Sequence, residues 1–229
     1  MAAQPVVLSL GWWTGLRAGL CAERWAWRLG FRRLAGTDEA GRGALAGPLV
    51  AAAVILPPEE QVEGLEELSD SKLLTPPARK RLFQRIIRTA EAWSYACICA
   101  SDIDRNGLQR TNISAMREAV LALVPLPDMV LVDYYRIEDL GLPQLSLVHG
   151  DRVSRSVAAA SILAKVIRDS LMWHWHLSYP QYGFESNKGY GTAHHLEALA
   201  AFGPAPCHRA SFHGVLQMAL VLDAEDGPD

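Results

Sequence analysis

Two adjacent acidic residues between two apolar segments constrain this sequence more than any other feature. The sequence Asp-Glu-Ala-Gly-Arg-Gly at 38–43 follows a short apolar run at 34–37 and precedes a longer one at 46–56 that reads as a strand. Two carboxylates at a strand end are costly to bury unless cations or hydrogen bonds compensate them. The glycines permit close backbone approach and the arginine adds a charged fork, which points to a metal beside a polyanion. An exposed acidic turn is the alternative that this segment leaves open.

The composition is that of a globular protein with a sizeable core. The 229 residues suit one large domain, or one domain with a small appendage, and 50% of them are hydrophobic. The formal net charge of −3 gives no overall basic field, which argues against a purely electrostatic binder of nucleic acid. Four cysteines form no CxxC pair, so reduced thiols in a cytoplasmic protein are expected.

The ends of the chain are expected to lie outside the main domain. We expect residues 1–22 to be an extension without chemistry, residues 23–223 to form one domain including the C-terminal helices, and residues 224–229 to be a tail. The apolar run at 6–16 is too short to cross a membrane, and no basic residue precedes it as in a signal peptide. The sequence therefore predicts no membrane partner.

Strand and helix patterns alternate along the chain. Strands are expected at 33–39, 49–56, 93–100, 129–132 and 145–148. Helices are expected at 75–92, 111–124, 154–176, 193–202 and 212–222. The opening strands look like an antiparallel pair, and the later ones alternate with helices, which favours an α/β fold with a mixed central sheet flanked by helices.

Four acidic residues follow the expected strands. Asp38 and Glu39 end the first strand, Asp133 ends the fourth, and Asp151 comes just after the fifth. Sites in open α/β sheets gather beyond strand ends, so these carboxylates are expected to converge. They cannot all stay ionised without cations, and oxygen-only ligands select Mg²⁺ or Mn²⁺. Since Asp38 and Glu39 would point to opposite faces of a regular strand, the strand must end or bulge there if they share a site.

Several short motifs, in their order and spacing, resemble bacterial ribonuclease HII, the type 2 ribonuclease H family. The motifs are DEAGRG at 38–43 with Gly-Pro at 47–48, DSK at 70–72, VD at 132–133, AAASILAKVIRD at 158–169 and KGYGT at 188–192. Each motif is weak alone, and together they are specific. The resemblance covers residues 23–212.

The resemblance implies a ribonuclease H-like fold with a helical C-terminal part, and an endonuclease. Such an enzyme hydrolyses RNA in RNA–DNA hybrids and cuts 5′ of single ribonucleotides in duplex DNA, leaving 3′-hydroxyl and 5′-phosphate ends. It uses Mg²⁺ or Mn²⁺, with two ions during catalysis. The implied roles are RNA primer removal and ribonucleotide excision in DNA replication and repair, by a cytoplasmic monomer.

By the same resemblance, the catalytic and metal-binding residues are Asp38, Glu39, Asp133 and Asp151. Members of the family usually have glycine after the third acid, where this sequence has Tyr134. We expect that tyrosine to adopt an extended conformation, turned away from the acids and packed under the loop that leads to Asp151. The alternative is a strained backbone, at about 1–3 kcal/mol.

The substrate-binding residues that the resemblance implies are Gly41, Arg42, Gly43, Lys72, Ser161 and Tyr190. The backbone of the glycine–arginine–glycine segment would sense the 2′-hydroxyl, which both donates and accepts hydrogen bonds. The tyrosine would stack on the next sugar, and the lysine and serine would contact phosphates. Arg168 and its basic neighbours are expected to pair with phosphates or carboxylates.

Two other functions fit parts of this pattern. One is another metal-dependent nuclease or recombinase of the same fold, and the other is a non-catalytic module that binds hybrids. Metal chemistry alone demands neither the glycine–arginine–glycine segment nor Tyr190, which argues against the first. A binder has no use for four acids near phosphates, which argues against the second.

Overall fold

In a computed structural model of the chain, residues 19–58, 64–65, 67–68 and 74–216 are described. The chain divides into two compact units. The first comprises Met1–Ala40, Ala51–Ala96 and Ile113–Val166, and the second comprises Gly41–Val50, Cys97–Asn112 and Ile167–Asp229. Because α6 (Arg155–Ser178) continues through residue 166, its first half belongs to the first unit and its second half to the second.

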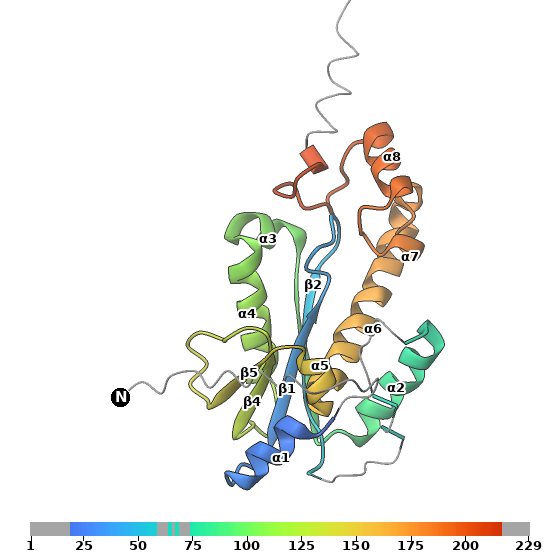
Figure 1. Ribbon diagram of the computed structural model, residues 1–229. Helices are drawn as coiled ribbons and strands as arrows, with labels where there is room; N and C mark the ends of the chain where they lie inside the picture. Colours follow the sequence, from blue (N-terminus) through green and yellow to red (C-terminus); the bar gives the residue numbers. More distant parts are fainter. Residues whose placement is uncertain (1–18, 59–63, 66, 69–73, 217–229) are drawn as a thin grey trace, which may run out of the picture. The chain divides into compact units, whose positions relative to one another are not determined.

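The first unit is built on the sheet, whose five strands lie in the order β3-β2-β1-β4-β5 (Figure 1). They are β1 (Leu34–Ala40), β2 (Leu49–Ile55), β3 (Ala92–Ile98), β4 (Met129–Asp133) and β5 (Gln144–Leu147). β4 pairs in parallel with both β1 and β5. The sheet is mixed and flanked by helices, as expected from the sequence, so the α/β fold class is confirmed.

The helices before α6 are α1 (Cys21–Arg28), α2 (Pro76–Thr89), α3 (Ala100–Asn106), α4 (Leu108–Leu121) and α5 (Gly150–Val153). After α6 come the 3₁₀ turn η1 (Pro180–Tyr182), α7 (Phe184–Asn187) and α8 (Ala193–Phe202). α2 begins as expected, because the Thr75 hydroxyl accepts from the Ala78 N–H at 3.4 Å and two prolines follow it. The helix expected at 212–222 lies mostly outside the described residues.

The structure also bears on the expectations about membrane-spanning segments and about the cysteines. Among the described helices, none is both long and apolar enough to span a membrane. The four cysteines are free thiols. The limits of the main domain stay a prediction.

A buried carboxyl group fixes α1 to the start of α6. Glu23 is buried, and one of its oxygens accepts from the Ser154 hydroxyl at 2.7 Å and from the Ser156 N–H at 3.0 Å. Burial raises the pKa of the Glu23 carboxyl above its ordinary value. Trp25 and Trp27 pack beside it on the core, and Figure 1 shows α1 at the lower end of β1. The first helix thus holds the N-terminus of the long helix in place.

β1 and α6 lie close together because Gly36 has no side chain. A Cβ atom at Gly36 would lie 2.0 Å from the carbonyl carbon of Ser156. Two residues further along β1 stands Asp38, and five residues further along α6 stands Ser161. Two strand residues and five helix residues each advance about 7 Å. The close approach at Gly36 therefore brings Ser161 level with Asp38.

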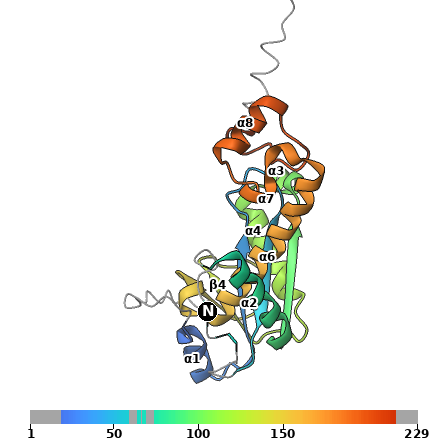
Figure 2. The ribbon, with the colours of Figure 1, turned by 90° about the vertical axis from the view of Figure 1, so that its right-hand side faces the viewer.

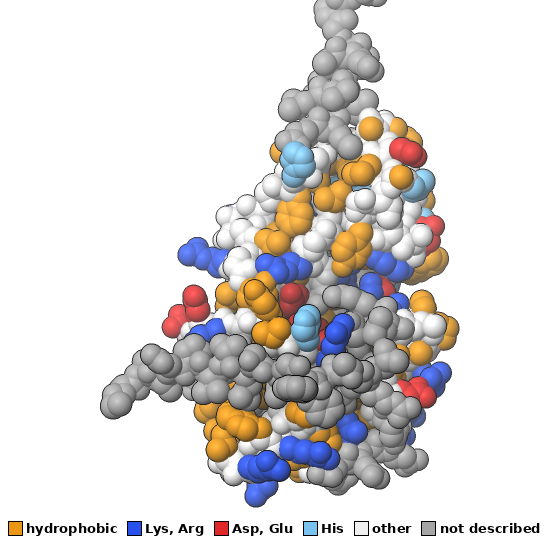
Figure 3. Space-filling view, viewed as in Figure 1, with side chains coloured by type: hydrophobic (Ala, Val, Ile, Leu, Met, Phe, Trp, Pro, Cys, Tyr) orange, Lys and Arg blue, Asp and Glu red, His pale blue; other side chains and the backbone are white. Residues whose placement is uncertain are grey.

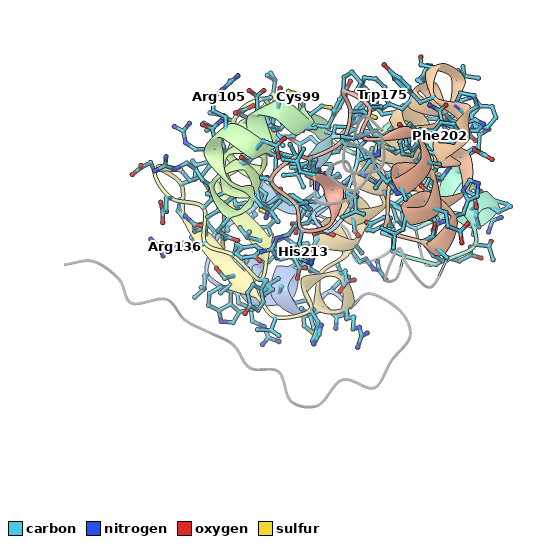
Figure 4. The ribbon with its side chains drawn as sticks, turned by 90° about the horizontal axis from the view of Figure 1, so that it is seen from above. Cys99, Arg105, Arg136, Trp175, Phe202 and His213 are labelled. Atoms are coloured by element: carbon cyan, nitrogen blue, oxygen red, sulfur yellow. The ribbon has the colours of Figure 1, made fainter. Side chains whose placement is uncertain are left out.

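An aromatic cluster forms the core of the second unit. It contains Met172 of α6, Tyr182, Phe184 and Leu199 of α8, with Trp175 packed at its edge. Figure 2 shows α7 and α8 beside the C-terminal half of α6, and Figure 4 labels Trp175 and Phe202 on the two longer helices. This cluster supports the segment at residues 188–192.

Tyr134 departs from the expected extended conformation. Its φ is +62°, which is left-handed, and its side chain is 66% exposed with its ring edge against Tyr135. The Tyr135 N–H bonds to the Asp133 carbonyl at 2.7 Å, closing a three-residue turn that ends β4. A left-handed backbone places Cβ too close to a carbonyl oxygen, so the tyrosine is strained. The prediction that it packs beneath the loop to Asp151 was wrong.

Replacing Tyr134 by glycine is expected to stabilise the protein by about 0.5–1 kcal/mol. Relief of about 1–2 kcal/mol of backbone strain exceeds the entropic cost of glycine in the unfolded chain, about 0.5–1 kcal/mol. Denaturant unfolding measures the difference. The matched variant Tyr134→Ala keeps Cβ and should gain nothing. A glycine variant that is less stable than the parent would show that the tyrosine ring contributes packing after all.

Candidate active site

Asp38 and Asp133 stand next to each other on neighbouring strands. The pairing of β1 with β4 runs to Thr37↔Val132, so the two acids occupy the next position in the same parallel register. Neighbouring strands are about 4.8 Å apart. Asp38 is 8% exposed and Asp133 is half-buried. The structure therefore places two of the four predicted acids side by side at the carboxyl ends of central strands.

The charge around Asp38 is concentrated and poorly solvated. Burial raises its pKa well above the ordinary value, and the neighbouring Glu39 and Asp133 carboxylates raise that pKa further. Hydrogen bonds from the Ser161 hydroxyl and from the Glu39 N–H, at 2.8 Å, oppose the rise only in part. Two acidic neighbours therefore disfavour the ionisation of Asp38, and a bound cation would offset this negative charge.

The segment carrying Asp151 is fastened to Asp133. The Gly150 N–H donates to Oδ1 of Asp133 at 2.7 Å, and Asp151 follows in the first turn of α5. His149 redirects the chain between β5 and α5 with a left-handed φ of 55°. The fourth predicted acid is therefore carried by a turn whose backbone is bonded to the third.

The donor set fits a hard divalent cation. Asp38, Glu39 and Asp133 offer oxygen ligands only, which Mg²⁺ and Mn²⁺ prefer. Within the described ranges, no three or more His, Cys, Asp or Glu side chains are grouped closely enough to hold a metal ion in the present geometry. β1 continues through Ala40, one residue beyond the predicted end at Glu39, although its pairing with β4 stops at Thr37. The strand therefore does not end between Asp38 and Glu39, which was one of the two conditions given for the two acids to share a site.

Asp38→Asn is expected to stabilise the metal-free protein by about 0.5–2 kcal/mol at neutral pH. A carboxyl group whose pKa is raised by folding destabilises the fold once it ionises above the unfolded pKa, about 3.9, and asparagine removes that ionisation. Thermal unfolding with a chelator and with excess Mn²⁺ measures both effects. The parent's Tm should rise with Mn²⁺ more than that of the variant. Equal metal responses in the two proteins would exclude Asp38 as a ligand.

Two buried arginines hold the segment that follows the acids, residues 41–48. Arg168 donates from Nε to the Pro48 carbonyl at 2.9 Å. Arg209 donates from Nη1 to the Arg42 carbonyl at 2.9 Å and from Nη2 to the Gly47 carbonyl at 3.0 Å. Phosphate or carboxylate pairing was expected for Arg168, whereas its hydrogen bonds go to backbone carbonyls. Both guanidiniums therefore fix backbone conformation.

Two neutral imidazoles, those of His195 and His208, form a hydrogen-bonded chain that ends at the backbone carbonyl of Tyr190. Nδ1 of His195 lies 2.9 Å from the Tyr190 carbonyl oxygen, the Nε2 atoms of His195 and His208 are 3.0 Å apart, and the Ala205 N–H donates to Nδ1 of His208 at 2.9 Å. Because a carbonyl only accepts, His195 carries its proton on Nδ1 and accepts at Nε2 from His208. Burial lowers the pKa of His208 to about 4 and also lowers that of His195.

This histidine pair should make the protein sensitive to acid. The pKa of histidine is about 6.5 in the unfolded chain and about 4 for His208 in the folded protein. Neutral His208 therefore contributes fully to stability above pH ~6.5. Acidification to pH ~5 should lower the free energy of unfolding by about 2 kcal/mol, because the unfolded chain then binds the proton more strongly. His208→Gln lacks this loss, and its free energy of unfolding should fall less between pH ~7.5 and ~5. The exposed His213, labelled in Figure 4, supplies the control variant His213→Gln. Parallel pH profiles of His208→Gln and the parent would contradict the assignment.

The other residues predicted to bind substrate differ in burial and in their contacts. Ser161 is buried on α6 beside Asp38, and Gly43 is exposed. Nη2 of Arg42 donates to Gln109 at 2.9 Å. Lys72 lies outside the described residues. The phosphate contacts assigned to Ser161 and Lys72 stay predictions.

Sequence reasoning missed the structural roles of four residues of the second unit. Three of them, Arg209, His195 and His208, received no role, and Arg168 was expected to pair with phosphates or carboxylates instead of backbone carbonyls. The short segments around them contain small and apolar residues, which gives no periodic signal for a polar network. An arginine within an otherwise apolar helix face was the available signal for Arg168.

Comparison with known proteins identifies the family. The family model described as ribonuclease HII matches residues 35–215. Ribonuclease HII of Pelotomaculum thermopropionicum is 53% identical over 186 residues, covering 81% of this chain and 70% of that protein. The ribonuclease H2 structure from Pyrococcus horikoshii OT3 aligns with a TM-score of 0.73 at 25% identity, over 83% of this chain and 99% of that one. The structure of Bst-RNase HIII in complex with Mn²⁺ has the same fold, with a TM-score of 0.69 at 21% identity over 87% and 73% of the two chains. The chain belongs to the ribonuclease HII family, whose members are endoribonucleases acting on RNA–DNA hybrids.

Proposed function

We propose that this enzyme cuts hybrids, and duplex DNA 5′ of single ribonucleotides, through divalent ions held by Asp38, Glu39, Asp133 and Asp151. The observation that carries the proposal is the adjacent pair of carboxylates on β1 and β4, with the pKa of Asp38 raised by its acidic neighbours. Bound Mg²⁺ or Mn²⁺ would neutralise this charge and activate water for attack on a phosphodiester. A related enzyme, Bst-RNase HIII, has been crystallised with Mn²⁺, which supports the choice of metal.

The protein's own groups would orient the substrate. The Gly150 N–H donates to Oδ1 of Asp133, and this hydrogen bond orients the carboxylate. Ser161 holds the Asp38 carboxylate in one orientation through its hydroxyl. These contacts fix two ligands before any substrate binds, which lowers the reorganisation needed during the reaction.

Recognition of a single ribonucleotide requires contacts to its 2′-hydroxyl and to the neighbouring deoxyribose. We assign the first contact to the backbone at residues 41–43 and the second to the Tyr190 ring. Gly41 has φ +90° and leaves its backbone without a side chain. Tyr190 is 39% exposed, so part of its ring remains open to a sugar.

Electrostatic attraction to the duplex is local in this proposal. In Figure 3, Lys and Arg side chains form several separate groups on the viewed face, with acidic side chains between them. The negative net charge of −3 agrees with this arrangement. A monomeric state and a cytoplasmic location stay predictions.

Cleavage of a DNA duplex that contains one ribonucleotide tests the proposal. With Mg²⁺ or Mn²⁺ we expect one cut on the 5′ side of the ribonucleotide, with a 3′-hydroxyl on the upstream product, and cleavage of a long hybrid. An all-DNA duplex should stay intact, and a chelator should stop both reactions. Cleavage of the all-DNA duplex would indicate a less selective nuclease of the same fold, and tight binding without cleavage would indicate a binding module.

A further inference from the structure

One buried guanidinium contacts both segments to which we assign substrate recognition. Arg168 is fully buried on α6. In addition to its bond to Pro48, its Nη2 donates to the Ala46 carbonyl at 3.1 Å. Its Cζ atom lies 5.4 Å from the centre of the Tyr190 ring. The same side chain therefore supports the segment at residues 41–48 and the tyrosine.

Arg168 also fills the space that a side chain at residue 41 would need. A Cβ atom at Gly41 would lie 1.8 Å from Nε of Arg168 and 2.4 Å from its Cδ. The φ of +90° at Gly41 is a second reason why no other residue suits this position. The conformation of the recognition backbone is thus matched to the arginine packed against it.

The Tyr190 ring is a second kind of partner for this guanidinium, beside the backbone carbonyls. Nη1 of Arg168 is buried and has no hydrogen-bond acceptor. The face of an aromatic ring attracts a guanidinium, and the planar group can stack on the ring while it donates within its own plane. Arg168 is therefore suited to contact carbonyls and ring together.

The two segments are also joined directly. The N–H groups of Leu45 and Ala46 donate to the Gly189 carbonyl at 2.8 and 3.2 Å, and Gly189 precedes Tyr190. Arg209 lies close enough to Arg168 that their like charges disfavour each other. Apolar residues often replace buried charges without loss of stability, so two buried arginines at one segment indicate a requirement for geometry.

We propose that Arg168 is a positioning residue that sets the spacing between the backbone at residues 41–43 and the Tyr190 ring, and so determines selectivity for a single ribonucleotide. This inference rests on the function proposed above. A lysine keeps the positive charge but has no planar fork, so it cannot bond both carbonyls while stacking on the ring. Arg168→Lys therefore separates geometry from charge.

Cleavage by Arg168→Lys should be compared on the duplex with one ribonucleotide and on a long hybrid. We expect kcat/KM at the single ribonucleotide to fall about tenfold or more relative to kcat/KM on the hybrid, which is the size of a lost stacking contact. Arg105→Lys, at an exposed arginine on α3 paired with Asp102, is the matched control and should not change the ratio. Equal losses on the two substrates would overturn the proposal, because a purely structural defect affects both alike.

The tyrosine provides a second test. In a Tyr190→Ala background, Arg168→Lys should change the substrate ratio by about twofold or less, because the two residues act through one contact. A full additional loss in that background would show that Arg168 does not act through the ring.

A measurement without activity keeps the proposal testable if the lysine variant folds poorly. The ¹⁹F resonance of 3-fluorotyrosine at position 190, assigned from its absence in Tyr190→Phe, should move in Arg168→Lys and in Gly41→Ala, whose Cβ must displace the guanidinium. An unmoved resonance in both variants would overturn the proposal. Should the parent enzyme fail to cut at single ribonucleotides, the proposed function would fail, while this resonance would still report whether Arg168 positions the ring.

Discussion

Asp133→Asn is expected to lower turnover by about 100-fold or more while the protein stays folded. A charged metal ligand contributes several kcal/mol to stabilising the transition state, and each 1.36 kcal/mol is about tenfold in rate. The fold should survive because asparagine retains an oxygen that can accept from the Gly150 N–H. Removing the charge also relieves the repulsion that raises the pKa of Asp38. Steady-state kinetics on a hybrid, with thermal unfolding of the same samples, measures both.

The matched control is an exposed acid away from the strand ends. Asp102 on α3 pairs with Arg105 at 2.9 Å, and Asp102→Asn should leave turnover within about twofold of the parent because surface ion pairs contribute little. A kcat for Asp133→Asn close to that of this control would mean that Asp133 does not bind the metal. The arrangement of acids at the sheet edge would then have to be reassigned.

Tyr190→Ala is expected to reduce cleavage at a single ribonucleotide about tenfold or more, and cleavage of a long hybrid less. Stacking on an aromatic side chain is worth about 1–3 kcal/mol, and the sugar that follows the ribonucleotide is deoxyribose only at the junction. kcat/KM on the two substrates gives the ratio. Tyr190→Phe keeps the ring against Arg168 and should retain most of the selectivity. If both substrates lose activity equally in the alanine variant, the tyrosine has a structural role only.

The elements of the first unit could be predicted because their burial follows simple patterns. β2 is apolar throughout its length and entirely buried, and its bounds agree with the expected 49–56 within one residue. Asp38 and Asp133 could be placed together because both lie near the carboxyl ends of parallel strands, a consequence of chain topology. Both the bounds of β2 and the positions of these acids follow from local patterns of apolar and polar residues, which a single sequence shows.

The conformation of Tyr134 could not be predicted in the same way. The choice between an extended and a left-handed backbone depends on the hydrogen bonds from its N–H to the Leu147 carbonyl and from Tyr135 to Asp133. The first of these partners is distant in sequence. An individual tyrosine favours the extended form, so local preference gave the wrong answer.

The polar network of the second unit was hidden for a related reason. Arg168 and Arg209 act on backbone carbonyls, and any residue type supplies a carbonyl. The partner of a buried arginine therefore leaves no mark in the sequence. His195 and His208 are thirteen residues apart and bond to each other, which only the packing of α8 against the following loop reveals.

The contact between Gly36 and Ser156 changes how sequence variants in this enzyme should be read. Neither residue is acidic, binds a metal in our proposal or faces a substrate. Yet an added methyl group at Gly36 would meet the α6 backbone and push apart the strand and helix that carry Asp38 and Ser161. A variant with a larger residue at position 36 would keep all four acids, so an inspection of the acids alone would classify it as an active enzyme. The sequence requirements for activity therefore include Gly36, which contributes only by leaving room for the α6 backbone.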